Sequence, residues 1–95
     1  MDERRIRQLA GELGITGRFG VGVLRSEIVS LGQIHRDGAT ILRPGAVGGW
    51  VSDAQRDEQM AQFAQAAARN VIALNKLRRI EPVELAGRLL AAAKS

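Results

Sequence analysis

The sequence predicts a mainly α-helical fold with a small β component (an α+β domain), on three observations. Apolar residues recur every three or four positions over residues 3–16, 53–80 and 82–94, as in amphipathic helices. Aromatic residues are only 3% of the chain, so the core must consist of Leu, Ile, Val and Ala, which suits close helix packing. A length of 95 residues predicts a single domain over residues 1–95.

The first expected helix spans residues 3–16. Its apolar face carries Ile6, Leu9, Ala10 and Leu13. Arg4 and Arg5 lie near its start, where the helix dipole disfavours cations, so a nearby bound anion would stabilise them. The alternative interpretation is a solvated, charged helix end.

Residues 17–51 are rich in glycine, since eight of the eleven glycines lie between Gly17 and Gly49. Each interior glycine costs a helix about 1 kcal/mol, so this stretch is predicted not to form one long helix. We expect a short helix over 24–31 and then a β-hairpin over 33–43, with strands at 33–35 and 40–42. Asp37-Gly38 supplies the turn. Residues 44–52 are expected to be a glycine-rich connection.

Residues 53–94 are predicted to form a helical hairpin. Ser52 or Asp53 caps the long helix over 53–80, and Pro82 begins the C-terminal helix over 82–94. The long helix is too apolar to stand alone in water, so it must pack within the chain or on a second subunit. We therefore expect a homo-oligomer, with contacts from Met60, Phe63, Ala67, Val71 and Leu74.

The composition excludes several classes of site. The chain has no cysteine and one histidine, His35, which excludes disulfides, thiolate metal sites and a multi-histidine metal site. No convergent acid–base pair is visible, so we expect no enzymatic activity, no cofactor, no metal and no small-molecule substrate. The absence of a long apolar run or an apolar leader predicts a cytoplasmic protein without a membrane partner.

One segment points toward DNA: Leu9-Ala10-Gly11-Glu12-Leu13-Gly14-Ile15-Thr16. It resembles the first helix and turn of helix-turn-helix DNA-binding proteins, and the resemblance covers about residues 7–25. In that family pattern Gly14 ends the helix in a left-handed conformation, Ile15 fills the space between helices and Thr16 caps the next helix.

The resemblance implies a recognition helix from about Gly17 to Arg25, with Arg18 and Arg25 contacting DNA. Gly17, Gly20 and Gly22 depart from the pattern, because they disfavour helix. An alternative resemblance, to helix–extended-loop–helix modules of some nucleic-acid proteins, covers residues 6–31.

The predicted hairpin resembles the wing of winged-helix proteins, which implies backbone or minor-groove contacts by Arg36 and Arg43. The alternative for residues 33–43 is an ordinary surface hairpin.

A net charge of +4 is compatible with nucleic acid. We therefore predict a small basic DNA-binding or nucleoprotein factor, such as a transcription regulator, that binds double-stranded DNA. The expected contacts are Arg4, Arg5, Arg18, Arg25, Arg36 and Arg43. This prediction requires the arginines to share one exposed side. If they are dispersed, the sequence favours the alternative, a helical adapter or assembly subunit that acts without nucleic acid.

Overall fold

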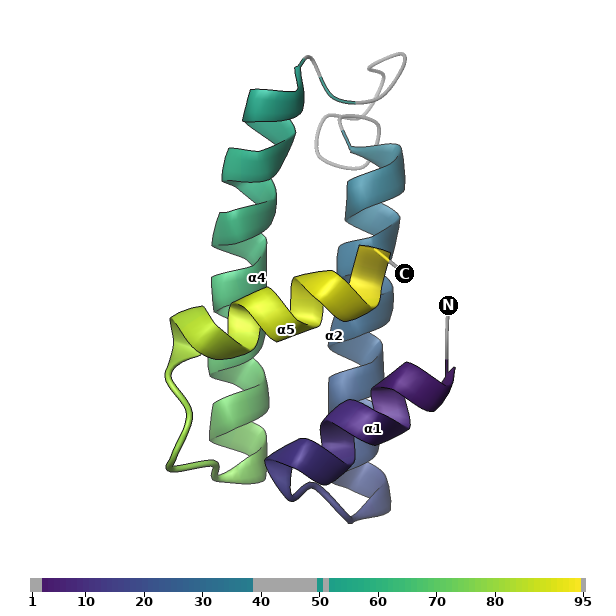
Figure 1. The fold of residues 1–95 in the computed structure, drawn as a ribbon, viewed down its shortest axis with the longest axis vertical. Coiled ribbons are helices and arrows are strands. Elements are labelled where there is room, and N and C mark those ends of the chain that lie inside the picture. Colours follow the sequence, from purple (N-terminus) through teal and green to yellow (C-terminus); the bar gives the residue numbers. More distant parts are fainter. Residues whose placement is uncertain (1–2, 39–49, 51, 95) are drawn as a thin grey trace.

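The structure is a computed structural model, and it describes residues 3–38, 50 and 52–94. These residues form α1 (Glu3–Leu13), α2 (Arg18–Asp37), α4 (Asp53–Asn75) and α5 (Pro82–Lys94). Figure 1 shows that α2 and α4 run side by side in opposite directions. α5 crosses both of them, and α1 crosses α2 on the same side of the pair. The mainly α prediction is therefore confirmed.

The core lies between the α2–α4 pair and the two crossing helices. Its largest fully buried side chains come from all four helices: Ile6, Leu24, Ile28, Leu31, Met60, Val71, Leu85 and Leu89. Ala64 and Ala68 of α4 are fully buried, and such small residues let neighbouring helices approach closely. The core thus consists of Leu, Ile, Val, Ala and one Met, close to the composition that the sequence predicts.

The β-hairpin over 33–43 is wrong, and no strand occurs in residues 3–38, 50 and 52–94. Residues 33–37, including the expected first strand, continue α2. Gly38 ends this helix with a positive φ of 46°, and its N–H donates to the Ile34 carbonyl at 2.7 Å. The Asp37-Gly38 signal therefore marks a helix end. The expected second strand at 40–42 lies outside the described residues.

The prediction of a short helix over 24–31 is also wrong in extent, because α2 has 20 residues and runs through three interior glycines. Burial of Leu24, Ile28 and Leu31 contributes about 1.5–3 kcal/mol for each side chain. Together these contributions outweigh the cost of about 1 kcal/mol for each glycine. Tertiary packing therefore decides the conformation of this segment.

α4 begins as predicted and ends earlier. The Ser52 hydroxyl accepts a hydrogen bond from the Gln55 N–H at 3.1 Å and caps the helix. The helix ends at Asn75, five residues before the predicted limit, because Lys76 adopts a left-handed conformation with φ 55°. Residues 76–80 then form a loop that leads to α5, which has the predicted bounds.

Candidate nucleic-acid interface

The turn between α1 and α2 has two of the features expected of it. Gly14 has a φ of 74°, the left-handed conformation that ends α1. Ile15 is buried, and its N–H donates to the Ala10 carbonyl at 2.8 Å. Thr16 does not cap the next helix; the residue before α2 is Gly17, which makes no side-chain cap. The turn is therefore compact and tied to the core through Ile15.

Arg25 is engaged within the chain. Its guanidinium donates to both carboxylate oxygens of Glu3, with Nε 3.2 Å from Oε2. This hydrogen bond is the main reason why the pKa of Glu3 is lowered, and the same contact raises the pKa of Arg25. The pair joins the start of α1 to α2, so Arg25 has a structural role in the folded chain.

The other expected arginines do not gather on one part of the molecule, because Arg36 lies far from Arg18. Arg5 donates to the Ala91 carbonyl at 3.4 Å and thereby joins α1 to α5, while Arg4 is exposed and also has an interaction within the chain. Arg36 is exposed at the end of α2 opposite Arg18, about 27 Å away by helical rise. Arg43 lies outside the described residues. The predicted set therefore does not form one surface.

A different set of cations does gather, on the loop between α4 and α5. Lys76, Arg78 and Arg79 are exposed, whereas Leu77 and Ile80 between and after them are partly buried against the core. The Leu77 N–H also donates to the Ile72 carbonyl at 3.0 Å. We call residues 76–80 the basic loop. Its two apolar anchors fix the loop, so the three cations are held at the surface.

The cations of the basic loop are not neutralised within the part of the chain that the structure describes. None of their side chains has an ion pair or hydrogen bond there. Beside the loop is an open hollow of about 470 Å³, whose lining also includes Glu12, Glu84 and Arg88. Arg88 bridges these two carboxylates at 3.3 and 3.0 Å. Glu12 and Glu84 are thus already paired with Arg88, whereas Glu81, next to the loop, is exposed.

The sequence carries a signal for the basic loop. The helix expected over 53–80 would place Lys76, Arg78 and Arg79 at its negative end, where cations are favoured, but in the structure this helix stops before them. The alternation of these cations with Leu77 and Ile80, directly before Glu81-Pro82, is the pattern of an anchored loop. Helical periodicity alone does not separate this pattern from a last helical turn.

Most residues of the expected oligomer contact face inward. Met60, Ala67 and Val71 are buried in the core of the chain itself, and Phe63 is partly buried. Leu74 retains 47% of its surface. Of the five, Leu74 is therefore the residue that this fold leaves most accessible to a partner.

The opposite end of the α2–α4 pair holds His35 and Trp50. The Trp50 indole N–H donates to the His35 carbonyl at 3.1 Å, and its ring packs against Gly38. This contact anchors Trp50 onto the end of α2. Burial is the main cause that lowers the pKa of His35, and the positive charge of Arg56 lowers it further.

Two further findings concern the described residues as a whole. They contain no group of three or more His, Asp or Glu side chains placed to hold a metal ion. None of the described helices combines the length and the apolar character needed to cross a membrane. Comparison of the chain with protein-family models, with curated proteins and with solved structures gave no match.

Proposed function

We propose that this protein is a small, non-enzymatic nucleoprotein factor of the cytoplasm that binds the phosphate backbone of DNA through its basic loop. The observation that carries the proposal is the set of three exposed, unpaired cations on a loop fixed by Leu77 and Ile80. Lys76, Arg78 and Arg79 replace the six arginines of the sequence prediction as the expected contacts.

The chemistry of the basic loop suits phosphate. A guanidinium donates in a fork that matches two phosphate oxygens, and because the fold anchors the loop, the side chains but not the loop itself must be ordered on binding. Each cation that neutralises a phosphate releases a counterion, which favours binding at low salt. The near absence of aromatic residues gives no platform for stacked bases. The proposed binding is therefore governed by the backbone rather than by the base sequence.

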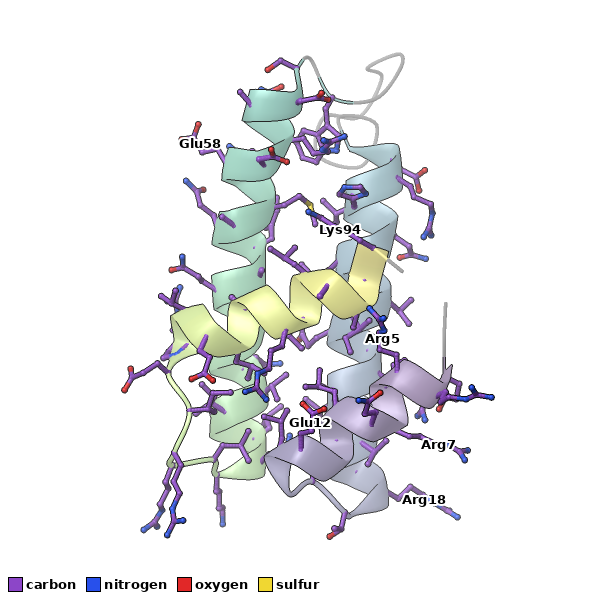
Figure 2. All side chains as sticks on the ribbon, in the orientation of Figure 1. Arg5, Arg7, Glu12, Arg18, Glu58 and Lys94 are labelled. Atoms are coloured by element: carbon purple, nitrogen blue, oxygen red, sulfur yellow. The ribbon has the colours of Figure 1, made fainter. Side chains whose placement is uncertain are left out.

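The helix-turn-helix resemblance remains a proposal about which nucleic acid is bound. Gly14 and Ile15 support it, since they have the conformation and burial that this turn needs. Arg18 supports it as well, because its side chain is exposed and unpaired among the described residues at the start of α2 (Figure 2). Regulation of transcription would follow only if α2 also contacts base edges.

A second candidate function is a helical adapter or assembly subunit that acts without nucleic acid. The internal contacts of Arg5 and Arg25 favour it, because cations engaged with Ala91 and Glu3 have structural roles and are not free for DNA. The exposed Phe19 also favours it, because Phe19 and the half-exposed Leu74 line one groove and together leave apolar surface for a partner.

A binding titration distinguishes the two functions. The full chain is titrated against a fluorescein-labelled duplex and the matching single strand, with anisotropy as the readout. Three phosphate contacts predict that affinity for the duplex falls about 40-fold between 50 and 200 mM salt. Saturable binding with this salt dependence supports the nucleoprotein function. The absence of binding at the lower salt concentration overturns it in favour of the adapter.

A further inference from the structure

An apolar groove lies on the α2–α4 pair where α2 begins and α4 ends. Phe19 and Leu74 keep 69% and 47% of their surface there, and Val23 is partly buried between them. The groove has a volume of about 330 Å³. Exposure of a phenylalanine beside a leucine in so small a protein leaves apolar surface that burial against another molecule would stabilise.

The α2 side of the groove follows one helical face. Phe19, Gly22, Val23 and Ser26 have the spacing i, i+3, i+4 and i+7, which places them in one row. A Cβ added at Gly22 would meet no atom within 4 Å. Packing inside the chain therefore does not require glycine at this position, although alanine would favour the helix by about 1 kcal/mol. A second helix that packs closely from outside would require it.

Opposite charges mark the two ends of this row. Arg18 stands before Phe19 and Glu27 stands after Ser26, and both line the groove. The Asn70 side-chain N–H donates to Glu27 Oε1 at 2.8 Å, which orients the carboxylate without neutralising it. Neither Arg18 nor Glu27 has an ion pair with a described residue.

This arrangement is complementary to itself. A two-fold axis through the row between Gly22 and Val23 would set α2 antiparallel to its copy. Arg18 would then face Glu27 of the partner subunit, at both ends of the contact. Phe19 would face Ser26 of the partner subunit, and the two glycines would meet near the axis. Charge and size therefore both match when the occupant is a second copy.

We propose that the groove binds a second copy of this chain, through antiparallel α2–α2 packing centred on Gly22 and Val23. The contact differs from the face first expected for an oligomer, whose residues Met60, Ala67 and Val71 are buried. None of the three basic-loop cations lines the groove. Dimerisation and phosphate binding by the basic loop thus use different residues, and either can fail without the other, whereas Arg18 would be shared between the dimer contact and the helix-turn-helix proposal. A contact limited to one row of side chains on α2 is small for a protein interface, so the dimer should be weak and its population should depend on protein concentration.

The test is sedimentation equilibrium of the full chain from about 1 µM to about 1 mM. Wild type is expected to form a dimer, and Phe19→Ser is expected to raise the dissociation constant at least about tenfold. The matched control is Val83→Ser. Val83 is 68% exposed on α5 and is not among the groove residues, so this variant should dimerise like wild type.

The two-fold register is tested by charge reversal. Arg18→Glu and Glu27→Arg should each weaken self-association, because each places like charges opposite one another twice. An equimolar mixture of the two single variants should dimerise again, because both contacts then pair opposite charges. Circular dichroism confirms that each variant is folded. A wild type that stays monomeric throughout, a dimer insensitive to Phe19→Ser, or a mixture that does not recover would each overturn the proposal.

Discussion

Gly20 and Asn75 approach so closely that a Cβ on Gly20 would lie 2.1 Å from the Asn75 side-chain oxygen. The Cγ2 atom of Ile15 would lie 3.0 Å from the same Cβ. Asn75 is held in this position by the hydrogen bond that its side-chain N–H donates to the Val71 carbonyl at 3.2 Å. The start of α2, the end of α4 and the α1–α2 turn therefore meet at a position that has no room for a side chain.

This contact predicts that Gly20→Ala destabilises the protein, although alanine has the higher helix propensity. Asn75 must rotate and lose its hydrogen bond, and Ile15 must shift, which costs about 1–2 kcal/mol. The measurement is chemical denaturation followed by circular dichroism. Gly87→Ala is the control, because no atom lies within 4 Å of its added Cβ; it should stabilise by up to about 1 kcal/mol. Equal effects of the two substitutions would contradict this interpretation.

Trp50→Phe is predicted to destabilise the protein by about 1 kcal/mol. Phenylalanine keeps a ring against Gly38 but removes the N–H that donates to the His35 carbonyl. The same denaturation experiment measures the loss. A variant as stable as wild type would show that this hydrogen bond contributes nothing to the end of α2.

His35 is predicted to make stability depend on pH in the mildly acidic range. Its folded-state pKa is lowered by burial and by Arg56, with smaller effects of Lys94 and Arg36 that exceed the opposing effect of Asp57. The unfolded chain, with a pKa of about 6.5, therefore binds a proton more readily than the folded chain. The contribution of neutral His35 to the free energy of unfolding should be fully present above that pH and should decrease as the pH falls through it.

The matched variant is His35→Gln, which cannot titrate. The free energy of unfolding of wild type and variant, measured between about pH 8 and pH 5, should converge or cross as the pH falls. A difference between the two proteins that stays constant over this range would contradict the assigned origin of the pKa shift.

The sequence predicted the helices whose apolar spacing is regular and whose ends carry clear signals. Ser52 and Pro82 begin α4 and α5 as expected, and Gly14 ends α1 as the helix-turn-helix resemblance implies, before the limit at residue 16 that apolar spacing predicts. α2 was not predicted, because the cost of its glycines was weighed without the burial of Leu31 and the close contact at Gly20. Both depend on contacts with residues that are distant in the chain, and local helix propensity takes no account of such contacts.

The candidate site was predicted less well for a related reason. Which arginines are free depends on ion pairs between distant residues, and Arg25 pairs with Glu3 across 22 positions. The exposed cations lie instead where α4 stops, and that limit depends on the left-handed conformation of Lys76. Composition correctly indicates a basic protein, but it does not indicate where the unpaired charge lies.

The most direct measurement of the central proposal is the salt dependence of duplex binding for a variant without the basic-loop cations. Lys76→Asn, Arg78→Ala and Arg79→Ala are combined, with asparagine chosen because it tolerates the left-handed conformation. The slope of log affinity against log salt should decrease in magnitude by about 2.7 for three lost phosphate contacts. The control is Arg36→Ala. Arg36 lies in the last turn of α2, away from the basic loop, so this substitution should leave the slope unchanged. A triple variant that binds with the wild-type affinity and slope would contradict the account.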